Sequence, residues 1–295
     1  MSRQTFLRRL GLAAGERAVV LHADDIGLGE ASVRAYAQIH QAGLLGSASV
    51  MVPSGWFPAV ADLARSGVHD LGVHLTLNSE WPNYRMAPLL GPAAASLADA
   101  QGWFHPLAVH THRHASADEA FAELSAQVRR ARTAGLAPTH IDSHMLTLLH
   151  PTLFEVYVRL SRQERLPATL IRMDADQLER LCRIPRSDAV QLHERLQAVD
   201  EEGLVAFDTF AELPLDAHDR RLDAAHRILD GLPEGLAMFI CHPACDGVEL
   251  RAMTTDWAAR AADHRLYLDD GWRRAIESSG IRTLNMRQVR DAMFP

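Results

Sequence analysis

The amino-acid sequence predicts an α/β fold in which parallel strands form a distorted (β/α) barrel. Short apolar runs alternate with longer amphipathic segments through the 295 residues, as expected for βαβ units and a parallel sheet buried on both faces. The seven or eight units of this kind favour a barrel over an open, doubly wound sheet. No Gly-x-Gly-x-x-Gly pattern or phosphate loop follows the first apolar run, which argues against a nucleotide-binding fold.

The expected strands are short, mostly apolar runs, too short for helices and bounded by turn-forming or polar residues. The first is an Ala-Val-Val-Leu-His run that ends at an Asp pair, and the seventh is an Ala-Met-Phe-Ile-Cys run that ends at His-Pro. In chain order, the expected strands span residues 18–22, 47–52, 71–77, 139–142, 169–172, 203–207, 236–241 and 282–284.

The expected helices lie between these runs and repeat apolar residues at three- and four-residue intervals, which gives each helix one buried face. Pro151 fits the first turn of one of them, where its missing N–H costs nothing. In chain order, the expected helices span residues 30–42, 59–66, 117–134, 151–163, 189–199, 218–229, 256–262 and 269–278.

One irregular segment, rich in Pro, Gly, Trp and His, interrupts the alternation around residues 78–115. A loop of that length inside a compact domain is usually functional, such as a lid or a binding loop. No domain linker, internal repeat or low-complexity tract is visible. We therefore expect a single catalytic domain over residues 1–295 with this insertion, in which His105, His110, His112 and His114 lie on a solvated loop.

Charge and cysteine content limit the partners and the compartment. The net charge is -7 and the isoelectric point is near 6.1, so no basic surface favours nucleic acid or an anionic membrane. No stretch is apolar and long enough to insert into a bilayer. The three cysteines are few, and no second pair joins Cys241 and Cys245 to make a zinc ribbon. A reducing cytoplasm is the expected compartment.

Polar residues follow several strands at the edge where the carboxyl ends of a parallel barrel converge. They are Asp24 and Asp25 after the first strand, His74 in the third, Asp142 and His144 after the fourth, and His242 after the seventh. One Asp and two His suit a divalent metal and leave positions for water and substrate. The second Asp then serves as a base, and His242 as an acid.

Each of these residues also has a structural interpretation. Asp25 could cap the following helix, and His74 could be a core histidine on a buried strand. Asp142 could orient a ligand instead of being one, since it shares a strand face with His144. His140 could face the helices, and His150 could mark the start of a helix. Polar residues occur at the ends of four strands. Taken together, they favour the functional interpretation more strongly than any one of them does alone.

The motifs around these residues resemble, in order, the signatures of the YdjC-type carbohydrate deacetylases, a family that includes chitooligosaccharide and hopanoid-pathway deacetylases. The matching segments are His-Ala-Asp-Asp-Ile-Gly from residue 22, Gly-Val-His-Leu-Thr-Leu from residue 72, His-Ile-Asp-Ser-His from residue 140 and Cys-His-Pro from residue 241. The resemblance implies metal-dependent removal of an N-acetyl group from an amino sugar or sugar conjugate.

The resemblance also implies roles for individual residues. It implies a metal site of Asp25, His74 and His144 that holds one divalent ion, zinc or magnesium, with Asp24 as the base and His242 as acid or oxyanion stabiliser. It further implies a homodimer. The family commonly continues Ser-His-x-His-x-His after the fourth strand, whereas here Met-Leu-Thr-Leu-Leu follows His144. This departure makes a substrate other than chitooligosaccharides the expectation.

Aromatic and basic residues of the irregular segment suit a sugar ring and its hydroxyl groups. We expect Trp81, Tyr84 and Arg85 to contact the substrate, although surface packing explains aromatic residues equally well. Two other functions are compatible with the same Asp and His set. One is a metal-dependent hydrolase of a phosphoester or cyclic amide, and the other is a non-catalytic sugar-binding relative.

Overall fold

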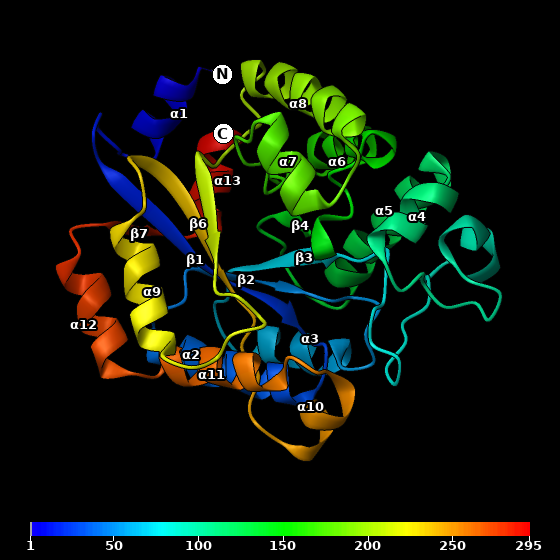
Figure 1. Cartoon of the computed structure of the whole chain (residues 1–295), viewed down its shortest axis with the longest axis horizontal. Coiled ribbons are helices and arrows are strands. Elements are labelled where there is room, and N and C mark those ends of the chain that lie inside the picture. The colour runs from blue at the N-terminus through cyan, green and yellow to red at the C-terminus, as the bar shows by residue number, and fades with distance from the viewer. Residues whose placement is uncertain (1) are drawn as a thin grey trace.

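A curled sheet of parallel strands stands at the centre of the computed structural model, which describes residues 2–295, and helices surround it (Figure 1). The pairing order is β4-β3-β2-β1-β6-β5, and β7 pairs with the first part of β1. The strands are β1 (Arg17–Ile26), β2 (Ser47–Val50), β3 (Leu71–Leu75), β4 (Ile141–Ser143), β5 (Thr209–Glu212), β6 (Gly235–Cys241) and β7 (Arg282–Leu284).

Residues 168–171 connect the two edges of this sheet. Ala168 forms a parallel bridge with Ile141 of β4, and Ile171 forms one with Phe207, just before β5. The sheet therefore curls into an incomplete, distorted barrel, and the predicted α/β class with parallel strands is confirmed. Two strand predictions need correction. Residues 169–172 make only these isolated bridges, and the strand expected over 203–207 begins later, at Thr209.

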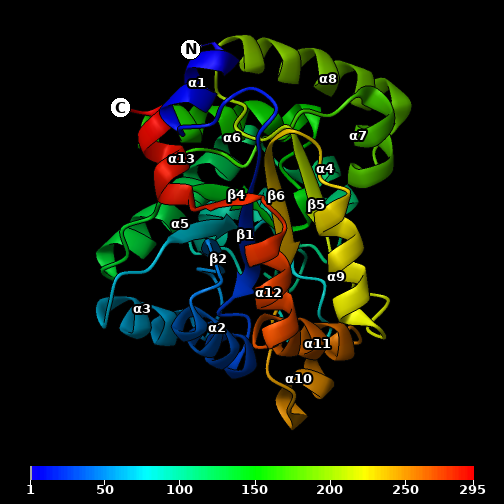
Figure 2. The same cartoon turned by 90° about the vertical axis from the view of Figure 1, so that its left-hand side faces the viewer.

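Most of the predicted helices are present and begin and end within a few residues of the expected positions. They are α2 (Glu30–Ala42), α3 (Phe57–Arg65), α5 (Ala117–Thr133), α6 (Pro151–Glu164), α8 (Arg186–Glu201), α9 (Arg221–Asp230), α11 (Trp257–Tyr267) and α12 (Asp270–Ser278). Figure 2 shows α9 and α12 beside β5, β6 and β1, and α1 next to α13.

Several helices were not predicted. They are α1 (Arg3–Arg9), α4 (Ala108–His114), α7 (Ala175–Cys182), α10 (Val248–Met253), α13 (Met286–Met293) and two short 3₁₀ helices, η1 (Gly91–Leu97) and η2 (His144–Leu146). The loop expected around His110, His112 and His114 is therefore wrong, because these residues form α4. Among the helices of residues 2–295, none combines the length and apolar character needed to cross a membrane.

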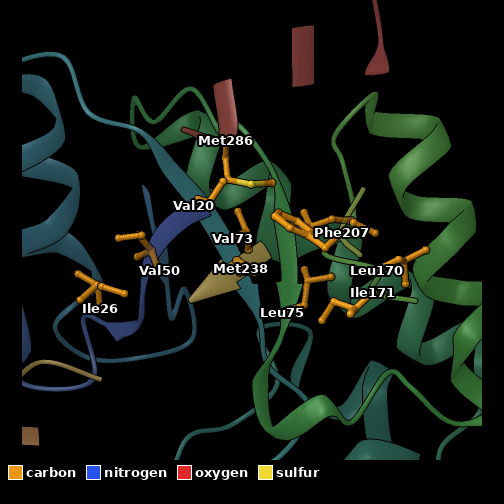
Figure 3. Close-up of a cluster of buried hydrophobic side chains, with 14 of the residues drawn as sticks. Val20, Ile26, Val50, Val73, Leu75, Leu170, Ile171, Phe207, Met238 and Met286 are labelled. Carbon is orange, nitrogen blue, oxygen red and sulfur yellow. The ribbon is translucent and has the colours of Figure 1, made fainter. Parts of the chain in front are cut away.

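A cluster of buried apolar side chains fills part of the barrel interior (Figure 3). Val20, Val73 and Met238 come from three strands, and Met286 reaches in from the start of α13. All four are almost completely buried. The carboxyl ends of the strands are the edge where the functional side chains of such a barrel usually meet.

Gly72 in β3 leaves space for a buried histidine beside the sheet. A Cβ built on Gly72 would lie 2.4 Å from Nε2 of His140, and the ring of His140 is itself completely buried. Any larger residue at this position must therefore move either β3 or the His140 ring, and β3 carries His74 two residues further on.

We predict that Gly72→Ala destabilises the protein by about 1–3 kcal/mol, because it overpacks a closed site. The free energy of unfolding from urea denaturation measures this. Gly247→Ala is the matched control, since an added Cβ there meets nothing within 4 Å and the backbone is extended. Equal stability of the two variants would show that the His140 ring moves without cost.

Candidate metal centre and catalytic pair

Three buried side chains from three strand ends meet at the carboxyl edge of the barrel. Oδ1 of Asp25 lies 3.3 Å from Nε2 of His74 and 3.2 Å from Nδ1 of His144, and these two nitrogens are 3.1 Å apart. Each of the three residues is at most 3% exposed. The structure thus brings together the three predicted ligands.

An irregularity in β1 separates the two adjacent aspartates. Ala23 pairs with Ala48 and Ile26 with Val50, so β1 uses one more residue than β2 over this stretch. Asp25 has a left-handed backbone with φ of 60°, which Asp tolerates better than most residues. The bulge turns the Asp25 carboxylate toward His74 and His144, because an extra residue re-aims the side chains of a strand.

The donor set fits a divalent cation. Ligand atoms lie about 2.1 Å from a bound metal ion, and the angle between two of them at the metal ranges from octahedral to tetrahedral. Two ligand atoms are then roughly 3.0–3.4 Å apart, which is the spacing observed here. Within residues 2–295, the buried Oδ1 of Asp25 has no aligned hydrogen-bond donor. A carboxylate and two imidazoles suit several divalent metals. These three residues could therefore hold one metal ion.

Two further groups of His and Asp have compatible spacing, but they suit a metal less well. Asp24, His74 and Asp142 form one, and His22, His140 and Asp142 form the other. The second group is fully enclosed in the barrel and leaves no open position for substrate. In the first, Oδ1 of Asp142 lies 3.0 Å from Nδ1 of His74. The hydrogen bond of His74 Nδ1 goes to the Ser49 hydroxyl at 3.1 Å, and Asp142 adds a negative charge beside the same nitrogen. Partners of this kind behind a ligating histidine help to orient it.

Arg260 of α11 neutralises the Asp25 carboxylate from the other side. Its Nη1 donates to Oδ2 of Asp25 at 2.8 Å, and its Nε donates to Asp256 at 2.7 Å. Burial acts to raise the pKa of Asp25, but Arg260, together with His144 and His74, holds that pKa well below its usual range. Asp25 is therefore ionised at neutral pH, with Oδ2 engaged and Oδ1 directed to the two histidines.

The predicted catalytic residues Asp24 and His242 face each other beside this centre. Nε2 of His242 is 3.9 Å from Oδ2 of Asp24, and both side chains are slightly exposed. The backbone N–H of His242 donates to Asp263 at 2.9 Å, and Asp263 forms a buried ion pair with Arg221. The end of β6 is thus fixed by α11, the helix that also carries Arg260.

His144 has a second partner that the sequence did not reveal. Its Nε2 lies 3.0 Å from a carboxylate oxygen of Glu80, which begins the irregular segment after β3. Burial acts to lower the pKa of His144, but Glu80 and Asp25 raise it to about 9. A proton therefore competes with a metal for the imidazole, and metal binding should weaken as the pH falls.

The residues predicted to contact substrate lie near the centre but in different surroundings. Trp81 is buried, and its ring centroid is 5.4 Å from that of His144. The Tyr84 hydroxyl lies 2.9 Å from the Ser54 hydroxyl. Arg85 donates to Asp99 at 3.0 Å. Tyr84 and Arg85 thus hold the irregular segment in place, and the substrate contacts of all three stay predictions.

The other histidines named from the sequence have structural partners. Nδ1 of the buried His140 lies 2.9 Å from the Thr139 hydroxyl, and burial together with nearby His22 lowers its pKa to about 3. His150 accepts a hydrogen bond from Thr152 at the start of α6 and stacks on His112 at 3.9 Å.

Sequence reasoning missed Glu80, Arg260 and His22. Glu80 directly precedes Trp81, a predicted substrate contact. Its place in the irregular segment was therefore the one sequence signal that Glu80 lies near the site. His22 lies inside the Asp-Asp motif, but its alternation with apolar residues resembles an ordinary strand. Arg260 lies on an amphipathic helix far along the chain, and no local pattern distinguishes it from the surface arginines.

Comparison with known proteins places these motifs in a recognised group. Residues 18–278 match the family model described as YdjC-like protein. A carbohydrate deacetylase from Thermus thermophilus is 36% identical over 288 residues, which cover 98% of this chain and 99% of that protein. A chitooligosaccharide deacetylase from Serratia marcescens is 28% identical, with 86% and 97% covered.

A solved structure has the same fold. It is described as a cellobiose-phosphate cleavage protein from Enterococcus faecalis V583, and it covers 93% of this chain and 99% of its own. The TM-score is 0.76 at 21% sequence identity.

We predict that Arg260→Met destabilises the metal-free protein by about 3–5 kcal/mol, because it leaves the buried Asp25 carboxylate without its cation. Urea denaturation in the presence of a chelator measures this. Arg186→Met is the control, since the pairs of Arg186 with Asp176 and Glu179 are exposed and should contribute little. A loss below about 1 kcal/mol for Arg260→Met would mean that Asp25 is neutralised in another way.

Proposed function

Because the chain belongs to the YdjC-like protein family, we propose that it is a metal-dependent hydrolase that removes an N-acetyl group from an amino sugar or a sugar conjugate. The observation that carries the proposal is the buried Asp25, His74 and His144 cluster directly beside the Asp24 and His242 pair. The carbohydrate deacetylase names of its relatives support the substrate class.

In this proposal Asp25, His74 and His144 hold one divalent metal, zinc or magnesium. A cation held there supplies Lewis acidity, which polarises an amide carbonyl and lowers the pKa of water toward neutrality. Arg260 keeps Asp25 ionised and engages its second oxygen, so that a single oxygen serves the metal. Glu80 orients His144 from its outer nitrogen, and Ser49 together with Asp142 orients His74.

Asp24 and His242 perform the proton transfers. Asp24, beside the cluster, accepts the proton of the attacking water as general base. His242 stabilises the developing oxyanion or donates a proton to the departing amine. Their proximity supports this assignment, since Nε2 of His242 is 3.9 Å from Oδ2 of Asp24.

The sugar is held by the irregular segment in this proposal, with Trp81, Tyr84 and Arg85 as its contacts. Trp81 lies against His144, so a ligand in contact with the metal centre would be close to this ring. The absence of the Ser-His-x-His continuation favours a substrate other than chitooligosaccharides. A cytoplasmic location and a homodimeric state stay predictions.

The experiment that tests the proposal is acetate release from a panel of N-acetylated amino sugars and sugar conjugates. The panel should include N-acetylglucosamine, its phosphates and chitooligosaccharides, each incubated with the zinc- or magnesium-loaded protein. We expect acetate and free amine in equal amounts from at least one compound, and none after chelation. If the panel gave no acetate while a phosphodiester or a cyclic amide was cleaved, the reaction class would be wrong.

We predict that His144→Ala loses most of the bound metal and the activity together, because it removes one of three ligands. Metal content is measured by inductively coupled plasma mass spectrometry after dialysis. His114→Ala is the matched control, since His114 is an exposed histidine of α4 that is stacked only on His105. Full metal occupancy in the His144 variant would reject the ligand assignment.

We predict unequal effects for the two aspartates. Asp24→Asn should keep its metal and lose turnover by roughly 10²–10⁴-fold, the usual contribution of a general base. Asp25→Asn should weaken metal binding itself, because a neutral amide replaces the anionic ligand. Calorimetric titration with metal and steady-state kinetics separate the two effects. The division of roles would be wrong if both variants bound metal equally well.

A further inference from the structure

His22 of β1 is a completely buried histidine that joins three strands of the barrel. Its Nδ1 lies 2.6 Å from the Ser47 hydroxyl of β2. Its Nε2 lies 3.1 Å from Oδ2 of Asp142 in β4 and 2.9 Å from Oδ1 of Asp24. No water-accessible surface remains on the ring. A side chain of this kind has no freedom to adopt another orientation.

The two carboxylates around this ring would repel each other without a cation between them. Burial acts to lower the pKa of His22, but Asp142 and Asp24 raise it to about 9. The ring is therefore an imidazolium at neutral pH, with one N–H donated to Ser47 and the other to Asp142. Asp24 is the second carboxylate beside that nitrogen. A charge-assisted contact of this kind is among the stronger hydrogen bonds of a protein.

Each carboxylate uses one oxygen for His22 and keeps the other for the site. The second oxygen of Asp142 lies 3.0 Å from Nδ1 of His74, whose Nε2 faces Asp25 and His144. The second oxygen of Asp24 faces His242. One ring thus stands behind both the proposed base and a proposed metal ligand.

We propose that His22 is a positioning residue that sets the orientation of Asp24 and, through Asp142, of His74. This inference rests on the proposed function, because it assigns His22 a part in metal binding and in general-base catalysis. The role depends on Nε2, which contacts both carboxylates and, at 3.3 Å, the Ser49 hydroxyl that bonds to His74. It does not depend on Nδ1, which contacts Ser47. Because the two ring nitrogens have different partners, substitutions can distinguish this positioning role of His22 from a role in packing alone.

Two amide substitutions separate the two ring nitrogens. The amide nitrogen of Gln in His22→Gln can take the place of Nε2 and donate to the carboxylates, whereas that of Asn in His22→Asn reaches only the place of Nδ1. We expect His22→Asn to lower the metal affinity by about 10–100-fold and to lower kcat by a similar factor. This is the usual effect of losing a residue that orients a metal ligand. The Gln variant should retain several-fold more of both, with KM changed less than kcat.

His140→Gln is the control, because His140 is equally buried and its ring centroid is 5.0 Å from that of His22, without contact to Asp24. Its kcat and metal affinity should stay near those of the unsubstituted protein, whatever its stability. Metal affinity is measured by titration with zinc or magnesium alone, and thermal melting shows that each variant is folded.

Equal kcat and equal metal affinity in the Asn and Gln variants would overturn the proposal, as would an unchanged metal affinity in the Asn variant. If the unsubstituted protein released no acetate, the proposed function would fail. The metal affinities of the two variants would still decide whether His22 positions the site.

Discussion

The bulge at the end of β1 is the constraint on which the site depends. In a regular strand Asp24 and Asp25 would point to opposite faces of the sheet, one of them toward the surrounding helices. The extra residue and the left-handed backbone of Asp25 bring both carboxylates to the same edge of the barrel. The two adjacent residues can then face different partners. Asp24 faces His22 and His242, and Asp25 faces His74 and His144.

Collecting carboxylates in this way creates a charge problem that the surrounding elements solve. Asp24, Asp25, Asp142 and Glu80 bring four carboxyl groups into one small volume. Arg260 and the His22 imidazolium offset two of them. In the metal-free protein, the nearby carboxylates raise the pKa of His74 and that of His144, so these two rings supply further positive charge. A divalent cation bound at the centre would take the place of their protons. Buried charge of one sign is otherwise strongly unfavourable.

The sequence predicted the parts of this centre that local pattern controls. Asp25, His74 and His144 each follow or end an apolar run, and parallel strands bring such positions together. The contribution of Arg260 depends on how α11 packs against the end of β1, which periodicity does not encode. The strand at residues 203–207 was misplaced for a related reason. The apolar run there ends in residues buried by packing, of which Phe207 makes an isolated bridge, while the continuous strand begins at the less apolar Thr209.

The pairing of Asp25 with Arg260 also has a consequence for the order in which the protein is made. The two residues are 235 positions apart. At about 5–20 residues per second, a ribosome adds Arg260 roughly 10–50 s after Asp25. Throughout that interval the nascent chain carries the Asp25 carboxylate without the guanidinium group that pairs with it. The enzyme is therefore completed only late in translation, and a chain released before α11 would contain all three proposed ligands without the arginine that keeps the first of them ionised and oriented.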